Sequence, residues 1–337
     1  MSGVAIVSPG YPSLAGGVTD HTRRIAAHWA TSRRVDIVGG LDEPPAALAA
    51  RLRAADVGGL LLQYVPFLYG RRGLSRVPLE LLRAARAATM RTAVFVHEPW
   101  VPPTRLPWLV LSPLQRRQLR AIVREADVAV TPVPAWRATL GPKVETLYVG
   151  STLGTAPADA PPIETPVVFS PFAAGLQWDW IAAAVREIGA GLTVIGATSE
   201  ELHHHTGTAE WAEREWTCTG RLPAEDVLRM LAGARLVLAP FVDGITGRRT
   251  SALAALSTGA QLVTSMGPLA DPFFADGPLD AAATRHGFVE LATRRWDETD
   301  DRAARARRRA WYEEHLDPAA LDRRLLDLTL GHGRESP

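Results

Sequence analysis

Short apolar runs alternate with longer amphipathic segments from the start of the chain. The short runs suit buried parallel strands, and the longer segments have the 3.6-residue period of the helices that connect such strands. The strands predicted in the first half are Val4–Ser8, Arg34–Val38, Gly59–Gln63, Ala93–His97 and Val128–Thr131. The helices predicted there are Val18–Thr31, Ala46–Ala54, Val77–Thr89 and Ser112–Glu125.

The pattern breaks at residues 150–166, which are rich in proline, glycine and small side chains, as linkers are. It then restarts, with predicted strands at Val167–Ser170, Leu192–Ile195, Glu215–Thr219, Leu236–Pro240 and Gln261–Thr264. The predicted helices are Trp178–Ile188, Glu225–Leu231 and Arg249–Ser257, followed by a charged helical tail over residues 302–330. This order predicts an α/β protein with two doubly wound, Rossmann-like domains and a ligand cleft between them.

Composition narrows the possible functions. A length of 337 residues fits two domains of about 150 residues each. The net charge of +1 gives no general basic field for a nucleic acid. No apolar run approaches the roughly 20 residues that span a bilayer, and the N-terminus lacks the features of a signal peptide. We therefore expect a cytoplasmic protein without integral membrane contact, although peripheral contact stays open.

Metal and thiol chemistry are not expected. Cys218 is the single cysteine, so an internal disulfide and a cysteine-based zinc site are ruled out. Its neighbours indicate a buried strand rather than a catalytic thiol. The three adjacent histidines 203–205 cannot easily face one ion, and we interpret them as a surface loop. Lys143 is the only lysine, so phosphate ligands in a binding loop have to be arginines.

A glycine pair follows the first predicted strand. Gly16 and Gly17 precede an amphipathic helix, and a helix N-terminus offers backbone N–H groups and a positive dipole end to a diphosphate. A glycine-rich turn with Thr19 or Asp20 as the N-cap explains the same residues equally well. Both interpretations stay open from the sequence alone.

A polar pair leaves the carboxyl end of another apolar strand. His97 and Glu98 follow residues 93–96, and the proline-rich loop after them restricts their positions. Because ligands bind at the carboxyl ends of parallel strands, we expect His97 in the cleft as a hydrogen-bonding positioner. Glu98 is expected to hold the acceptor or to fix the tautomer of the imidazole.

The segment 240–251 carries the strongest chemical signal. A strand leads into a glycine loop and then a helix whose first turn is expected to hold Arg248, Arg249, Thr250 and Ser251. Cations are unfavourable at a helix N-terminus unless an anion lies between them and the backbone N–H groups. These four residues therefore predict a phosphate site, with a pair of solvent-facing arginines as the alternative.

The order of these segments resembles retaining glycosyltransferases of family 4, which have GT-B architecture, over nearly the whole chain. The resemblance rests on Gly16-Gly17-Val18, on His97, on residues 220–228 and 232–240, and on Ala-Ala-Leu-Ser-Thr-Gly at 254–259. It implies an acceptor-side domain at 1–155, a nucleotide-sugar-binding domain at 156–312, and a C-terminal helix at 313–337 that returns to the first domain. It also implies a nucleotide-diphosphate sugar as donor and no metal or other cofactor.

The chain departs from this family at one motif. The family has two glutamates with seven residues between them, and registering on Gly259 puts Thr246 and Ala254 at those places. Asp243 is the nearby acidic residue expected to act at the donor sugar. The resemblance assigns Arg221, Leu222 and Thr246 to nucleotide binding.

The acceptor is the least determined part. Tyr64 and Trp100 lie in segments that offer aromatic walls for a small ring-bearing molecule, such as a specialised metabolite. The expected activity is sugar transfer to such an acceptor. A non-catalytic relative that binds a nucleotide or assists a partner enzyme, and a sugar-nucleotide epimerase, remain as alternatives.

Overall fold

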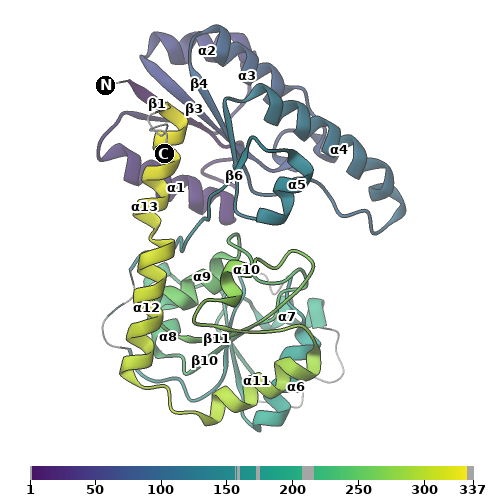
Figure 1. The fold of residues 1–337 in the computed structure, drawn as a ribbon, viewed down its shortest axis with the longest axis vertical. Coiled ribbons are helices and arrows are strands. Elements are labelled where there is room, and N and C mark those ends of the chain that lie inside the picture. Colours follow the sequence, from purple (N-terminus) through teal and green to yellow (C-terminus); the bar gives the residue numbers. More distant parts are fainter. Residues whose placement is uncertain (1, 156, 158–159, 172–174, 207–215, 332–337) are drawn as a thin grey trace. The chain divides into compact units, whose positions relative to one another are not determined.

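The computed structural model describes residues 2–155, 157, 160–171, 175–206 and 216–331. Contacts divide the chain into two units: Met1–Val149 together with Pro318–Pro337, and Gly150–Asp317. The divisions predicted from the sequence lay at residues 155 and 312. Each unit is built on its own parallel sheet (Figure 1). We describe each unit by itself, and the cleft expected between the two domains stays a prediction.

The first unit contains a six-stranded sheet in the order β2-β1-β3-β4-β5-β6, with every pair parallel. Its strands are β1 Gly3–Val7, β2 Val35–Val38, β3 Val57–Tyr64, β4 Arg91–Val96, β5 Val128–Thr131 and β6 Val144–Thr146. The strand order reverses between β1 and β3, so loops leaving the carboxyl ends of these two strands diverge and leave room for polar side chains.

Helices cover both faces of this sheet (Figure 1). They are α1 Gly17–Ala30, α2 Pro45–Ala54, α3 Val77–Ala87, α4 Leu106–Glu125, α5 Arg137–Leu140 and α13 Pro318–Leu330. Single 3₁₀ turns lie at Pro66–Leu68, Arg71–Gly73 and Pro134–Trp136. Alternate strand residues, such as Ile6 and Phe95, pack with Ile25 and Trp29 of α1 and with Leu325 of α13 in one apolar core. The last helix is thus a structural part of the first unit.

The second unit repeats the design with the order β12-β11-β10-β7-β8-β9. Its strands are β7 Val167–Phe169, β8 Leu192–Ile195, β9 Trp216–Cys218, β10 Leu236–Ala239, β11 Gln261–Ser265 and β12 Asp280–Ala282. Its helices are α6 Trp178–Ile188, α7 Ser199–Thr206, α8 Ala224–Gly233, α9 Thr250–Ser257, α10 Pro272–Ala275, α11 Arg285–Asp297 and α12 Arg302–Leu316. The order of strands reverses between β7 and β10.

Several predicted elements need correction. The histidines at 203 and 204 lie in α7 and not in a loop. Cys218 is half-buried in β9, which is an edge strand, rather than fully buried; burial still raises the pKa of its thiol. The tail is two helices, because Asp317 and Pro318 interrupt it. A proline at the first position of a new helix has no intrahelical N–H to lose, so the break falls there.

The helix predicted at Ser112–Glu125 begins six residues earlier, at Leu106. Its second half packs on the unit through Leu119 and Ile122, as expected for a helix that covers a domain. The added first turns expose Leu106 and Val110 at 80% and 67% of their surfaces. None of the helices in the described part of the chain is long and apolar enough to cross a membrane.

Candidate functional site

The reversal of strand order in the second sheet brings two loops together at the carboxyl ends of β7 and β10. The N–H of Val242 donates to the oxygen of Gly175 at 3.2 Å, and the N–H of Gln177 donates to that of Pro240 at 2.8 Å. Leu176 and Phe241 form an isolated antiparallel bridge. Open α/β sheets bind their ligands at this kind of position. Within this unit, the loop that follows β10 is therefore the candidate site.

Backbone contacts hold that loop in one shape. Gly244 has a φ of +88°, and a Cβ there would lie 2.5 Å from the backbone nitrogen of Gly267. The N–H of Ile245 donates to Ser265 at 3.0 Å, and the N–H of Leu269 donates to the oxygen of Asp243 at 3.0 Å. Glycine is required at 244 because any other residue would be strained at this positive φ and its Cβ would clash with the backbone of Gly267. The loop is thereby fastened to the segment after β11.

Three charged side chains of the loop meet each other. Asp243 forms ion pairs with Arg248 and Arg249, and each of the three side chains keeps only about a fifth of its surface exposed. The guanidinium of Arg249 also lies 4.5 Å from the ring centre of Phe241, a cation–π distance. Asp243, which is predicted to act at the donor sugar, is therefore paired with the two arginines that are predicted to bind the diphosphate of the donor.

The helix α9 starts directly after these arginines. Arg249 is its N-cap, and the side chain of Arg249 does not cap the helix, so both arginines precede the helix instead of forming its first turn as predicted. Thr250 and Ser251 occupy the first turn, half-buried. The first N–H groups of a helix have no intrahelical partner and carry the positive end of the dipole. Two guanidinium groups beside this turn make an arrangement that can bind an anion.

The two positions where the resembled family has glutamates are both buried. Thr246 has no exposed surface, and its Oγ1 has no hydrogen-bond partner among the described residues, so it lies inside the loop instead of on it. Ala254 is also fully buried, inside α9. An exposed ribose-binding side chain is therefore not found at either place, contrary to what was expected of Thr246.

Arg221 and Leu222 lie after β9, on the same edge of the sheet but three strands away from β10. Arg221 is more than half exposed and is 2.7 Å from Glu201 of α7. Leu222 is partly exposed. The structure thus does not bring this pair together with Arg248 and Arg249.

In the first unit, Gly16 and Gly17 begin α1 after the loop that leaves β1. Gly16 is the N-cap, with a φ of +150°, and a Cβ at either glycine would meet nothing within 4 Å. Thr19 lies inside the helix and donates its hydroxyl to the oxygen of Leu14 at 2.5 Å, while Asp20 pairs with Arg23. Neither Thr19 nor Asp20 is the N-cap, so that alternative is wrong. The open helix end stays a candidate for an anion.

His97 is 8% exposed and lies directly after β4. Its Nε2 is 2.5 Å from Oε1 of Gln63 on the neighbouring strand β3. The ring stacks on Phe95 with centroids 4.5 Å apart and meets the edge of His21 of α1 at 5.2 Å. Burial lowers the pKa of His97 to about 3, so the imidazole is neutral at ordinary pH.

Two other candidates of the first unit, Glu98 and Trp100, lie at its surface. Glu98 is exposed, and the Nε2 of His97 is held by Gln63 and not by this carboxylate. Trp100 is partly exposed, with the guanidinium of Arg116 4.6 Å from its ring centre. These two residues keep surface that a small molecule can contact.

Tyr64 is different, because it has no exposed surface. Its ring stacks with Tyr69 at 6.0 Å, and its hydroxyl accepts a hydrogen bond from Nε2 of Gln118 at 3.2 Å. Burial raises the pKa of this phenol to about 12. Tyr64 is a core residue in this structure, contrary to the expected role as an acceptor wall.

Two polar residues beside His97 were missed from the sequence. Gln63 was counted as the end of an apolar strand, and His21 as a residue of the helix after Gly17. Both are buried, at 0% and 1% exposed. A glutamine inside an otherwise apolar strand, and a histidine beside Thr22 and Ile25 on the buried helix stripe, are the signals that could have found them.

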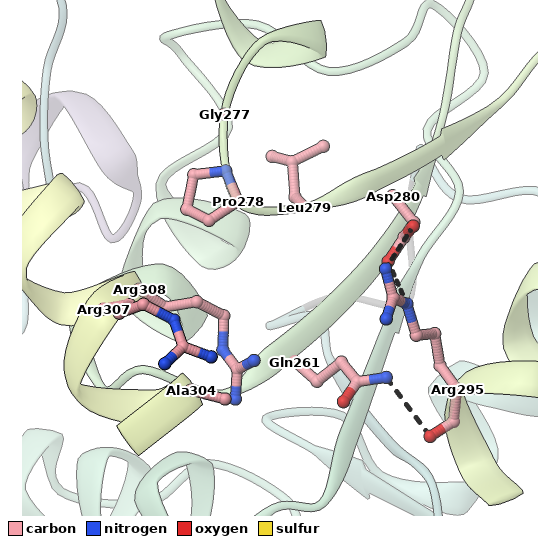
Figure 2. Close-up of a pocket in the computed structure, with 9 residues that line it drawn as sticks. All are labelled: Gln261, Gly277, Pro278, Leu279, Asp280, Arg295, Ala304, Arg307 and Arg308. Carbon is pink, nitrogen blue, oxygen red and sulfur yellow. Dashed lines mark hydrogen bonds and ion pairs between the residues drawn. The ribbon is translucent and has the colours of Figure 1, made fainter. Parts of the chain in front are cut away.

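A separate pocket of the second unit lies at the amino ends of β11 and β12, on the opposite edge from the loop after β10 (Figure 2). Its walls include Gln261, Asp280 and three arginines. Arg295 pairs with Asp280 at 2.6 Å, and Arg308 pairs with Asp300. Because open α/β sheets bind their ligands at the carboxyl ends of their strands, we do not assign the donor phosphates to this pocket.

No family model matches the chain, and no curated protein matches it in sequence. Solved structures match its whole length. Sucrose-phosphate synthase from Thermosynechococcus elongatus has a TM-score of 0.74 with 15% identity, covering 100% of both chains. Anabaena Alr3699/HepE, in complex with UDP and glucose, has a TM-score of 0.69 with 12% identity, covering 97% of this chain and 99% of that one. AviGT4, a glycosyltransferase involved in avilamycin A biosynthesis, has a TM-score of 0.63 with 17% identity, covering 99% of both.

The fold is GT-B. Two parallel six-stranded sheets, each doubly wound, account for the matches over both halves of these GT-B proteins. The fold class predicted from the sequence is therefore confirmed. At 12–17% identity the likeness shows the fold alone, and activity has to be argued from the residues.

Proposed function

We propose that the chain is a glycosyltransferase that moves a sugar from a nucleotide-diphosphate sugar to a small soluble acceptor, with retention and without a metal. The observation that carries this proposal is the pair Arg248 and Arg249 beside the start of α9, at the reversal point of the second sheet. The fold supports it, since HepE, which has the same fold, binds UDP and glucose.

In the proposed reaction, the diphosphate of the donor binds between the two guanidinium groups and the first N–H groups of α9. The bond between the anomeric carbon and the phosphate oxygen breaks, and its electron pair stays on the phosphate. A hydroxyl oxygen of the acceptor forms the new bond on the same face of the sugar, and its proton passes to the leaving phosphate. Charge on that phosphate is stabilised by groups that are already oriented, which makes this the largest contribution to catalysis.

The two units have different proposed roles. His97 is neutral, so it holds a sugar hydroxyl by a hydrogen bond and does not serve as an acid near neutral pH. Glu98 and Trp100 keep exposed surface for the acceptor. Participation of AviGT4 in avilamycin biosynthesis supports an acceptor from specialised metabolism.

Replacing Arg248 or Arg249 by alanine tests the assignment. Each change is expected to lower kcat/KM by about 100-fold, because it removes about 3 kcal/mol of transition-state stabilisation. Arg229→Ala is the matched control, since Arg229 also pairs with an aspartate, Asp226, but lies on α8. Unchanged turnover in both loop variants would contradict the proposal.

A second candidate is a non-catalytic GT-B protein that binds a nucleotide. The observation in its favour is that Thr246 and Ala254, which stand where the resembled family has glutamates, are both fully buried. Calorimetry with nucleoside diphosphates, followed by turnover with the matching sugar nucleotides, separates the two. Binding without turnover of any donor would favour this candidate.

A further inference from the structure

Three buried polar side chains from three different elements of the first unit form one cluster. His21 of α1, Gln63 of β3 and His97 at the end of β4 are 1%, 0% and 8% exposed. The two imidazoles meet edge to face with centroids 5.2 Å apart. Gln63 contacts His97 directly, and its side chain is also near enough to raise the pKa of His21 slightly against the larger effect of burial. The glutamine and the two histidines therefore form one buried polar cluster.

Neither histidine carries a charge near neutral pH. Burial is the main cause of a pKa of about 3 for His97 and of a pKa well below the usual range for His21. The positive charge of Arg24 and the neighbouring His97 lower the pKa of His21 further. A neutral imidazole has one N–H and one lone pair, so its hydrogen-bonding partners decide which nitrogen carries the proton.

The contact between Gln63 and His97 determines which nitrogen of the His97 ring carries the proton. Oε1 of Gln63 lies 2.5 Å from Nε2 of His97, and an amide oxygen only accepts hydrogen bonds. Nε2 of the neutral ring must then carry the proton, and Nδ1 is left as an acceptor. If the amide turned over, its NH₂ group would donate to Nε2 and the proton would move to Nδ1. The orientation of one amide thus sets the polarity of the ring.

Stacking on Phe95 holds the plane of the His97 ring. We therefore expect Gln63 to determine the protonated nitrogen of this ring and not its position. Phe95 lies 4.5 Å from His97 at an interplanar angle of 28°. The backbone N–H of His97 donates to the oxygen of Tyr64 at 3.0 Å, which fixes the chain at the base of the side chain. These contacts do not depend on the Gln63 amide.

We propose that Gln63 is a positioning residue that holds His97 as the neutral tautomer with the proton on Nε2 and the lone pair on Nδ1. If His97 contacts the donor sugar, as the proposed function has it, the ring accepts a hydrogen bond from a sugar hydroxyl through Nδ1. The tautomer follows from the first unit alone. The contact with the sugar rests on the proposed function.

Nitrogen–proton correlation spectra of the full chain, labelled with ¹⁵N-histidine, measure the tautomer directly. His97→Gln identifies the His97 signals among the nine histidines. We expect the wild-type ring to show protonated Nε2 and unprotonated Nδ1, without titration between pH 5.5 and 8. A wild-type ring protonated on Nδ1 would overturn the proposal, and this measurement needs no variant of Gln63 to fold.

Variants of Gln63 then test the cause. Gln63→Met removes the acceptor at nearly constant volume, and we expect the His97 signals to shift to a mixture of both tautomers. Gln63→Glu places a carboxylate against Nε2, and we expect the pKa of His97 to rise into the measured pH range. Gln118→Met is the matched control, because Gln118 bonds Tyr64 and Gly73 in the same unit but not His97. An unchanged tautomer in Gln63→Met would also overturn the proposal.

Activity separates this proposal from the proposed function. If both hold, Gln63→Met lowers kcat about tenfold while the affinity for nucleoside diphosphate, assigned to the second unit, stays unchanged. A tautomer that changes in Gln63→Met while kcat stays constant would confirm the role of Gln63 and contradict the proposed role of His97.

Discussion

His97 and His21 are buried in neutral form, and this makes the stability of the first unit depend on pH. In the unfolded chain a histidine has a pKa of about 6.5, whereas burial lowers the pKa of folded His97 to about 3. Between these values the unfolded chain binds a proton that the folded chain does not. The stabilisation is therefore complete above pH 6.5 and is lost as the pH falls towards 3.

We expect the free energy of unfolding to fall by up to about 1.4 kcal/mol per pH unit for each of the two histidines below pH 6.5. Urea unfolding at pH 7, 6 and 5 measures this slope. His97→Gln and His21→Gln should each make it shallower. His286→Gln, at a histidine that is 85% exposed, should leave it unchanged. Equal slopes in all four proteins would contradict the burial account.

Asp243 occupies the two arginines of the loop in the structure, and a diphosphate has to compete with its carboxylate. We expect Asp243→Asn to bind nucleoside diphosphate about tenfold more tightly, a change of about 1.4 kcal/mol, because the opposing charge is removed. If Asp243 also acts at the donor sugar, kcat falls in the same variant.

Calorimetry and steady-state kinetics on Asp243→Asn separate these two effects. Asp226→Asn is the control, since it removes a carboxylate from the pair with Arg229 on α8. Weaker diphosphate binding in Asp243→Asn would mean that the carboxylate orients the arginines instead of competing with the ligand.

Single residues of the site were predictable where their chemistry conflicts with their position. Two arginines at a helix start and a histidine at a strand end stand out in the sequence, and the structure places the first pair at the reversal of the strand order. The burial of Gln63 and Thr246 could not be predicted from the sequence in this way. Burial of a polar side chain depends on which elements pack on it, and the sequence does not give that packing.

Among the helices, α13 shows how a distant segment completes a core. The carboxylate of Asp322 is 2% exposed and is 2.7 Å from Nη2 of Arg24, and it also contacts His28. The Nε1–H of Trp29 donates to the backbone oxygen of Asp322 at 2.8 Å. A polar anchor and an apolar core thus join α13 to α1.

We expect Asp322→Asn to destabilise the first unit by about 3 kcal/mol, because it removes the carboxylate from a largely buried arginine. The Trp29 bond should remain, since it uses the backbone of residue 322. Denaturant unfolding followed by tryptophan fluorescence measures the loss. Asp327→Asn is the control, at an exposed position of the same helix. Equal stability of both variants would contradict a structural role for the anchor.

Whole elements followed from periodicity where apolar runs were long. The strands β5 and β8 and the helix α6 have the bounds predicted from the sequence. The short strands β6 and β12 were missed, because three residues give too little alternation to detect. The helix α11 was also missed, since its polar sequence is held by packing against α6 and not by a strong apolar stripe.

At the scale of the whole molecule, the conclusion concerns the fold. Two sheets with reversed strand order, matched over their whole length by structures of glycosyltransferases and related proteins, establish the GT-B fold. The rhythm of strands and helices predicted this because it is repeated along the chain. The donor, the acceptor and the stereochemistry depend instead on a few side chains in loops, which the rhythm of strands and helices does not predict.

The most direct test of a sugar transfer is mass spectrometry of reactions that pool nucleotide-diphosphate sugars with a small-molecule cell extract. The account predicts that one donor is consumed only when extract is present, with one nucleoside diphosphate and one new glycoside formed in equal amounts. The same reaction with Arg249→Ala should be slower by about 100-fold. No consumption of any donor, or consumption without extract and without a glycoside, would contradict the account.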